Sequence, residues 1–218
     1  MRETPTGDPD PYRVYDRIAA HFSRTREHPW PDVAAFVDAR EGARALDLGC
    51  GNGRHAELLA DVADDVVGVD ASAGLLAEAR ERAAERGYDV SLVRGDAERI
   101  PLRDATIDLA VYVATLHHLP TRAARVASLD ELARVLTPDG VALVSVWSTT
   151  HDRFDADAGF DTTVDWTLPD GTVVPRYYHI YDPAEFRDDI DASALDVRDV
   201  YESRGNSYAV VSPEGKPS

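Results

Sequence analysis

The chain of 218 residues contains one cysteine, Cys50, and one lysine, Lys216. A lone cysteine excludes an internal disulfide and any metal site built from several cysteines, so we expect no bound metal. No apolar run approaches the ~20 residues that a membrane-spanning helix needs. The first residues also lack the apolar stretch of a signal peptide. These absences predict a cytoplasmic protein with no membrane contact.

Positive charge is also scarce, since 40 Asp and Glu stand against 23 Lys and Arg and give a formal net charge of −17. Dense carboxylates keep a protein hydrated and dispersed where salt screens ordinary repulsion. The composition therefore indicates a halophilic source. It argues only weakly against a nucleic-acid partner, because local arginine clusters still bind phosphate.

Strand and helix patterns alternate through the middle of the chain. Strands are expected at 44–48, 66–70, 90–94, 107–114 and 141–147, and helices at 54–62, 72–86 and 121–136. The last of these helices is expected to end in a turn at Pro138-Asp139-Gly140. Such alternation predicts an α/β fold with a mostly parallel, doubly wound Rossmann-like sheet and helices on both faces.

Other patterns flank this region. A loose arm is expected at 1–11, helices at 12–22 and 32–40, a loop at 23–31, a hairpin with strands 163–168 and 172–178, a short helix at 182–188, and strands at 195–201 and 207–211. We predict a single domain over 1–218. Residues 12–40 would form an N-terminal cap, 163–180 a hairpin insertion, and the C-terminal strands an antiparallel part of the fold.

Glycines cluster where the first core strand meets its helix, at Gly49, Gly51 and Gly53. Glycine at such a turn lets backbone N–H groups approach a ligand closely. The spacing is GxGxG rather than the GxGxxG of dinucleotide-binding proteins. Asp47, two residues earlier, adds negative charge that would disfavour a pyrophosphate. The segment therefore favours a ligand that carries an ammonium group and a sulfonium.

Carboxylates follow the next two strands. Asp70 is placed to accept hydrogen bonds from both ribose hydroxyls of a nucleoside. Asp96 can accept from the adenine amine, and the Ala97 N–H can donate to a ring nitrogen. With the strand at 108–114, these features resemble class I S-adenosylmethionine-dependent methyltransferases. The resemblance implies strand order 3-2-1-4-5-7-6 and S-adenosylmethionine held by Asp47, Gly49, Cys50, Gly51, Asn52, Gly53, Asp70, Asp96, Ala97 and Val113.

Two further segments resemble a narrower family, the tRNA wobble-uridine carboxymethyl methyltransferases, which also form part of an AlkB-type tRNA hydroxylase. The segments are Ser23-x-Thr25-Arg26-x-x-Pro29-Trp30-Pro31 and Arg176-Tyr177-Tyr178-His179. The resemblance implies methylation of the carboxylate of 5-carboxymethyluridine in a tRNA anticodon loop, which gives a methyl ester. It also implies a small zinc-ribbon activator, expected along edge strand Val90–Arg94 and over Leu75, Leu76 and Tyr88.

The implied substrate is ionised at neutral pH, so its oxygen is already a nucleophile and needs no general base. Arginine holds a carboxylate through two parallel hydrogen bonds, and aromatic side chains stack on an extruded base. The expected catalytic and substrate-binding residues are Arg26, His117, His118, Trp147, Arg176 and Tyr177, with Tyr178 as a further stacking candidate. Expected phosphate contacts are Arg24, Arg26, His28, Arg122 and Arg125.

Two alternatives share the cofactor motifs. One is a small-molecule methyltransferase that acts on a quinone precursor or a metabolic acid. The other is a non-catalytic scaffold that binds the cofactor without turnover.

Overall fold

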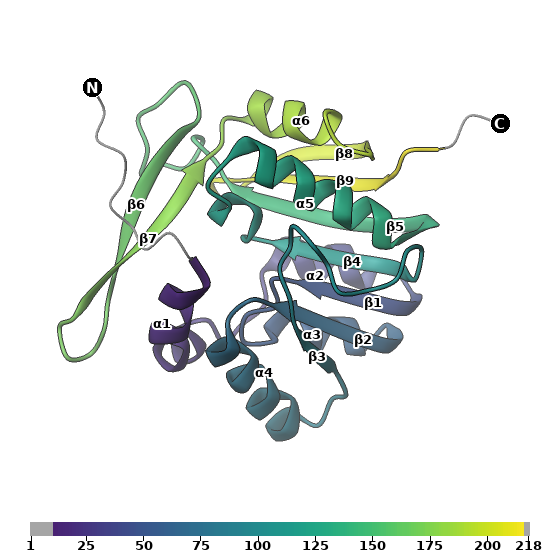
Figure 1. Cartoon of the computed structure of the whole chain (residues 1–218), viewed down its shortest axis with the longest axis horizontal. Coiled ribbons are helices and arrows are strands. Elements are labelled where there is room, and N and C mark those ends of the chain that lie inside the picture. The colour runs from purple at the N-terminus through teal and green to yellow at the C-terminus, as the bar shows by residue number, and fades with distance from the viewer. Residues whose placement is uncertain (1–10, 216–218) are drawn as a thin grey trace.

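The computed structural model describes residues 11–215, which form a seven-stranded sheet with helices on both faces and a separate two-stranded sheet beside it (Figure 1). The first half contains α1 (Pro11–Thr25), α2 (Pro31–Asp38), β1 (Gly42–Leu48), α3 (Arg54–Ala60), β2 (Ala63–Asp70), α4 (Ala73–Arg86) and β3 (Ser91–Arg94). The second contains β4 (Ile107–Val113), the short helix η1 (Leu116–His118), α5 (Arg122–Val135), β5 (Leu136–Trp147), β6 (Phe160–Thr167), β7 (Val173–Ile180), α6 (Pro183–Asp191), β8 (Leu195–Ser203) and β9 (Asn206–Pro213).

The large sheet has the order β3-β2-β1-β4-β5-β9-β8. Neighbours from β3 to β5 run parallel, whereas β9 is antiparallel to both β5 and β8. This confirms the predicted fold class and strand order, with β3 at one edge. The loose arm expected over 1–11 lies outside the described residues, except that α1 already begins at Pro11.

Helix boundaries follow local capping chemistry. The Ser72 hydroxyl accepts a hydrogen bond from the Leu75 N–H at 3.1 Å, and α4 stops at Gly87, whose φ of 75° suits glycine. Thr121 caps α5 and Asp182 caps α6 in the same manner. These short-range signals are readable from sequence because donor and acceptor lie within a few residues of each other.

Several boundary predictions were wrong by three residues or more, at α1, β2, β5, β6 and α6, and two of them have a clear local cause. β5 begins at Leu136, because Pro138-Asp139-Gly140 continues the strand instead of forming a separate turn. Its ladder with β4 changes register between Ile107 and Leu109, and such a bulge accommodates extra residues. α1 runs on to Thr25, whose hydroxyl donates to the His21 carbonyl at 3.1 Å, so the loop begins later than expected.

Both faces of the central strands are buried. On β1, Leu46 and Leu48 pack in the cluster that includes residues of α5 and α6, whereas Ala45 packs with α2 and α3. Side chains alternate between the two faces of a strand, so Asp47 projects on the same face as Ala45. The sheet is thus a rigid base whose strand ends hold the loops of the site.

The hairpin β6–β7 stands apart from the large sheet, at the side where α1 lies (Figure 1). Its turn contains Gly171 at φ +85°, as the Pro-Asp-Gly signal predicted. Trp166 and Val174 of the hairpin pack with Val14 and Ile18 of α1. Helix α1 and the hairpin, which are distant in the sequence, therefore pack together.

The surface expected to receive an activator differs from the prediction. Leu75 and Leu76 are already buried in the fold, and the Tyr88 hydroxyl donates to the Gly53 carbonyl at 3.0 Å. Leu75 and Leu76 are therefore not exposed to a partner, whereas the half-buried Tyr88 keeps part of its side chain at the surface.

No helix of the described residues is long and apolar enough to cross a membrane.

Candidate active site

A cavity of about 790 Å³ lies beyond the carboxyl ends of β1, β2 and β4. Loops at this end of a parallel sheet commonly bind ligands, and the volume falls in the range of small-molecule sites. One wall comes from the glycine loop and the strand ends, and the other from α1 and the hairpin. Predicted residues that line it are Arg26, Gly49, Cys50, Gly51, Asn52, Asp70, Asp96, Ala97, Val113, His117, His118, Trp147, Arg176 and Tyr178.

The loop after β1 requires glycine for two reasons, its left-handed backbone conformation and the space around its backbone. Gly49, Gly51 and Gly53 have φ values of 70°, 55° and 76°, a left-handed region that other residues rarely adopt. A Cβ on Gly49 would collide with the Thr115 hydroxyl oxygen, so a side chain does not fit. At Gly51 the nearest side-chain atom would be 3.7 Å away, which leaves space beside the backbone for a ligand.

Cys50 packs inside this loop. It is buried, and burial raises the pKa of its thiol well above the ordinary value. A neutral buried thiol is a poor nucleophile. Its side chain therefore serves packing, while the loop backbone offers the polar groups.

Asp47 is a buried carboxylate with unused hydrogen-bonding capacity. Its Oδ2 atom has no partner among the described residues, and burial raises its pKa to about 7 despite the opposing charge of Arg54. An isolated buried carboxylate is costly unless a cation or donor satisfies it. Asp47 does not itself line the cavity, but it lies directly behind the glycine loop that does, and its unpartnered oxygen fits the ammonium group of S-adenosylmethionine.

Asp70 joins two elements of the cofactor wall. Its Oδ2 accepts from the Gly51 N–H and its Oδ1 from the Ser72 N–H, both at 2.8 Å. Burial raises its pKa. An ionised carboxylate has about four acceptor positions, so capacity remains for two ribose hydroxyls. Asp96 and Ala97 line the cavity next to it, where the adenine was expected.

The side chain of Asn52 contacts the segment that follows α1. Its amide donates to the Arg26 carbonyl at 3.0 Å and so ties the glycine loop to the segment after α1. Gly53, in turn, is the N-cap of α3. Asn52 thus shapes the cofactor wall through its side-chain amide, and Gly53, which does not line the cavity, does so through its backbone.

The two histidines after β4 have separate roles. His118 is fully bonded: its Nδ1 donates to the Tyr177 carbonyl and its Nε2 accepts from the Tyr15 hydroxyl, both at 2.9 Å. The Nδ1 of His117 accepts from the Trp147 N–H at 2.9 Å, which leaves the proton on Nε2. Burial lowers the pKa of both, to about 4 for His118, so both are neutral at pH 7. His117 is therefore the one with a donor to offer.

Arg176 is the buried cation of the hairpin wall. Its guanidinium donates to the Tyr178 hydroxyl at 2.7 Å and the Tyr15 hydroxyl at 3.4 Å, and it stacks 4.8 Å from the centre of a Trp166 ring. Its Nε atom is buried with no partner, and no carboxylate pairs with it in the described chain. A buried cation without a counter-ion is a site prepared for an anion.

Arg26 and Tyr177 differ from Arg176 in position. Arg26 is exposed at the cavity edge, over Trp166 at 5.3 Å, and donates to the Thr25 carbonyl. Tyr177 does not line the cavity, because alternate side chains of β7 point to opposite faces. Its hydroxyl donates to Asp161 at 2.7 Å. The expectation that Tyr177 stacks on the substrate is corrected, and Tyr178 lies in the cavity instead.

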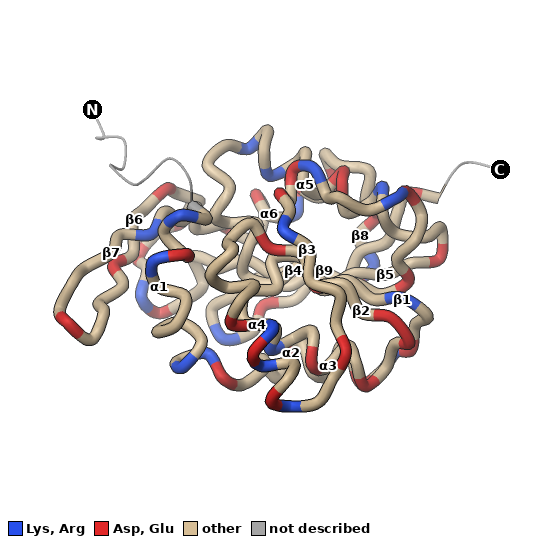
Figure 2. The backbone as a smooth tube through the Cα atoms, turned by 60° about the horizontal axis from the view of Figure 1, so that its bottom comes forward, with Lys and Arg blue, Asp and Glu red and all other residues tan. Residues whose placement is uncertain are grey.

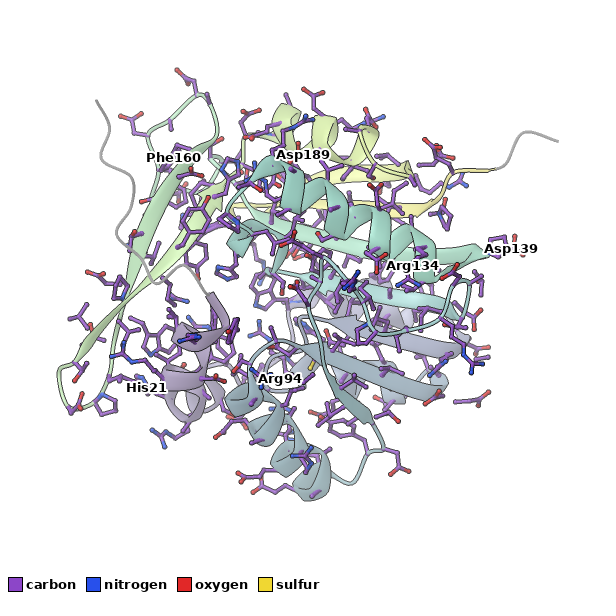
Figure 3. All side chains as sticks on the ribbon, in the orientation of Figure 1. His21, Arg94, Arg134, Asp139, Phe160 and Asp189 are labelled. Carbon is purple, nitrogen blue, oxygen red and sulfur yellow. The ribbon has the colours of Figure 1, made fainter. Side chains whose placement is uncertain are left out.

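Of the two phosphate contacts expected on α5, Arg125 is corrected because it is buried, whereas Arg122 keeps an exposed side chain and stays a prediction. Arg125 is buried and pairs with Asp189 at 3.4 Å, and Arg122 pairs with the same carboxylate at 2.6 Å. Figure 3 labels Asp189 between α5 and α6. Neither arginine lines the cavity, and nor do Arg24 and His28.

Sequence reasoning missed Tyr15 and Trp166 as site residues. Both line the cavity, where Tyr15 meets His118 and Arg176, and the Trp166 indole N–H donates to His21 Nδ1 at 3.0 Å. His21 is labelled on α1 in Figure 3. The periodicity of the helix around Tyr15 and of the strand around Trp166 predicts that both are buried. It does not predict which residues of other elements they contact.

A parallel sheet of this order, with a GxGxG turn and carboxylates at successive strand ends, defines the class I methyltransferase type of Rossmann-like fold. A "Methyltransferase domain" family model matches residues 46–144. A protein of Encephalitozoon cuniculi, named as a methyltransferase, is 36% identical over 179 residues, which cover 78% of this chain and 79% of that protein. The chain belongs to the S-adenosylmethionine-dependent methyltransferase family.

Other relatives carry more specific names. Mouse tRNA (carboxymethyluridine(34)-5-O)-methyltransferase ALKBH8 is 39% identical over 142 residues, 65% of this chain. The chain spans only 20% of that protein and 33% of an Arabidopsis thaliana relative of the same activity name. The Schizosaccharomyces pombe protein of that name is 26% identical over 91% of this chain and 94% of its own length.

Solved structures share the fold. The DhpI-SAM-HEP complex is 25% identical with a TM-score of 0.73, over 97% of this chain and 100% of that one. A methyltransferase chain in complex with the Haloferax volcanii Trm112 methyltransferase activator is 19% identical with a TM-score of 0.67, over 94% and 97% of the two chains.

Proposed function

We propose that this chain transfers a methyl group from S-adenosylmethionine to the carboxylate of a carboxymethyl-modified wobble uridine in tRNA and so forms a methyl ester. The observation that carries the proposal is Arg176, a buried cation with no carboxylate partner in the cavity that holds the glycine loop. A substrate carboxylate supplies the missing counter-charge. The names of the mouse and Schizosaccharomyces pombe relatives support the same reaction.

The site has the charge pattern that esterification needs. Bound S-adenosylmethionine supplies an electrophilic methyl group on a sulfonium. Arg176 holds the substrate carboxylate by its guanidinium, and a second oxygen stays free to attack. The charges of anion and sulfonium cancel along the reaction coordinate, so the dry, aromatic wall stabilises the transition state relative to the separated ions. Alignment, rather than proton transfer, is the main contribution of the protein.

The neutral histidines agree with this chemistry. A carboxylate needs no base, and both imidazoles lack the proton affinity of one because burial lowers their pKa values. His117 offers its Nε2–H to the carboxylate or to a uracil oxygen. Trp147 and Tyr178, whose ring centres lie 5.3 Å apart, offer faces for the base. Arg26, at the edge, contributes a second positive charge.

Residues 12–40 and the hairpin 163–180 would act together as the substrate cap of a single methyltransferase domain. Their contact through Trp166, His21 and Phe22 closes the cavity on the side opposite the cofactor wall. The enzyme would work in the cytoplasm, on tRNA. The anticodon loop is the expected binding partner because its bases are single-stranded and can be extruded.

We also propose an activator protein on edge strand β3. Ser91–Arg94 pair with β2 on one side only, and Leu92 and Val93 are half-buried. An open edge allows a partner to add a strand. The Haloferax volcanii complex supports this kind of partner. Leu92→Asp would then abolish co-elution with the activator, and because Leu92 is half-buried the melting temperature of the isolated variant is measured beside it to show that it is folded.

The reaction is tested with tRNA from a strain that lacks the gene. The protein, with and without the activator, is incubated with labelled S-adenosylmethionine, and the digested nucleosides are weighed. We expect a uridine derivative heavier by one methyl group. Arg176→Gln should reduce its formation at least about a hundredfold with cofactor binding retained, because a buried charge pair loses one partner.

The matched control is Arg103→Gln, an exposed arginine in the loop before β4, at the opposite end of the sheet. It should leave methylation unchanged. Label that enters a metabolite extract but not tRNA would refute the proposal in favour of a small-molecule methyltransferase. Cofactor binding without any turnover would indicate a scaffold.

A further inference from the structure

Five arginines line the cavity of this acidic chain. Seven of the arginines outside the cavity form ion pairs, namely Arg44, Arg82, Arg86, Arg122, Arg125, Arg134 and Arg187, and others, such as Arg103, form none among the described residues. The five that line the cavity, Arg26, Arg54, Arg153, Arg176 and Arg204, form none among those residues. Arg54 has the charge of Asp47 nearby, and Arg26 and Arg176 serve the proposed substrate. Arg153 and Arg204, here called the arginine rim, remain unexplained.

The arginine rim is built by two loops that pack together. The Arg153 N–H donates to His151 Nδ1 at 3.0 Å, and the guanidinium lies 5.8 Å from the Trp147 ring centre. Gly205, next to Arg204, packs so closely on His151 that a Cβ would lie 2.5 Å from it. The Ser148 N–H donates to the Gly205 carbonyl at 3.0 Å. The two arginines are therefore held on adjacent segments.

Arg204 stands where arginine is unfavourable. It is the first of two turn residues between β8 and β9, with φ values of 50° for Arg204 and 75° for Gly205. Such a turn favours Asn-Gly, because a left-handed conformation strains most side chains. Strain of this kind is often retained for function. Both rim side chains are exposed, and neither guanidinium has a hydrogen bond within residues 11–215.

We propose that Arg153 and Arg204 bind backbone phosphates of single-stranded RNA on either side of the nucleotide whose base enters the cavity. This rests on the proposed function and extends it to a specific contact surface. Arginines that alternate with an aromatic face, here Trp147, are suited to phosphates and stacked bases. Asp152, Asp155 and Glu202 are neighbours of the rim in the sequence, so Arg153 and Arg204 are the side chains of these two loops that offer positive charge to a phosphate.

Binding is measured by the fluorescence anisotropy of a labelled anticodon stem-loop RNA with the full chain, between about 50 and 200 mM salt. Arg153→Gln and Arg204→Asn should each weaken affinity about tenfold. Each should also reduce the slope of log affinity against log salt by about 0.7, the value for one single-strand phosphate. Arg103→Gln should change neither. Wild-type affinity and slope in both rim variants would overturn the proposal.

Arg204→Asn also separates binding from folding. Asparagine suits the left-handed turn, so its melting temperature should equal or exceed that of the wild type. Weaker RNA binding by this variant cannot then be attributed to a damaged fold. An Arg204→Asn protein that binds RNA normally would refute a phosphate contact at this residue.

The two proposals fail in different ways. RNA binding that depends on the rim, without methyl ester formation, would support the arginine rim and refute the proposed reaction. Methylation whose KM for tRNA is unchanged in both rim variants would refute the rim and leave the reaction intact. With free 5-carboxymethyluridine as substrate, the rim variants should match the wild type, because no phosphate is present.

Discussion

At the scale of single residues, the buried carboxylate of Asp47 lowers the stability of the ligand-free protein and is expected to bind the cofactor. The folded chain buries its carboxylate without a full set of partners, and burial raises its pKa to about 7 from the ordinary aspartate value of 3.8. Between these values the folded state binds a proton that the unfolded state has lost. This group therefore makes the ligand-free protein less stable as pH rises from about 4 to 7. A bound ammonium group would reverse the penalty.

We predict that S-adenosylmethionine binds more tightly as pH rises to about 7 and then levels off. Below that value affinity should fall about tenfold per pH unit, because Asp47 must ionise before it pairs with the ammonium group. Asp47→Asn should remove this pH dependence and weaken binding. It should raise the free energy of unfolding of the ligand-free protein at pH 8 by about 1–3 kcal/mol. Calorimetric titration and thermal melts measure both, and an unchanged pH profile in the variant would contradict the assignment.

At the scale of elements, α1 connects the two walls of the cavity. The Asp16 carboxylate accepts from the Ser72 hydroxyl at 2.7 Å and the Gly74 N–H at 2.9 Å, at the start of α4. On the hairpin side, α1 meets Trp166 through His21. Movement of α1 would therefore disturb the cofactor wall and the substrate wall together.

We predict that Asp16→Ala lowers the free energy of unfolding by about 1–2 kcal/mol, since two hydrogen bonds at a helix N-terminus are lost. For a chain of this size the melting temperature should fall by about 2–8 °C. S-adenosylmethionine affinity should also fall several-fold. The control is Asp139→Ala, an exposed aspartate that Figure 3 shows at the far end of the sheet. Equal melting temperatures for the two variants would refute the role of Asp16.

At the scale of the whole molecule, charge dominates. Figure 2 shows acidic residues spread over most elements, with basic residues interspersed among them. A net charge of −17 repels itself in the compact state. Screening shortens from about 10 Å at 0.1 M salt to about 3 Å at 1 M, so salt weakens this repulsion. The halophilic origin suggested by composition stays a prediction.

We predict that the melting temperature rises by several degrees between about 0.1 and 1 M KCl, because screening relieves repulsion among surface carboxylates. Sucrose of equal osmolality provides the control, since it stabilises by exclusion without screening charge. A melting temperature that is flat or falls with KCl would contradict an electrostatic origin.

Much of the fold was predictable because its signals are local. The helix caps at Ser72 and Gly87, the Pro-Asp-Gly hairpin turn and the glycine loop each act within a few residues, and strand order followed from the family resemblance. The start of β5 was not predictable in this manner. Its register depends on pairing with β4, which overrides the turn preference of Pro138-Asp139-Gly140.

The sequence by itself indicated that Gly49, Gly51, Asp70 and Asp96 lie together, because they end or follow strands that meet at one edge of the sheet, and all four line the cavity. Tertiary structure decided the substrate wall. It selected Tyr178 over Tyr177, gave His118 two internal partners, and brought Tyr15 to Arg176 across 161 residues of sequence. Local periodicity defines which side chains share a face, but only the packing of distant elements decides what that face meets.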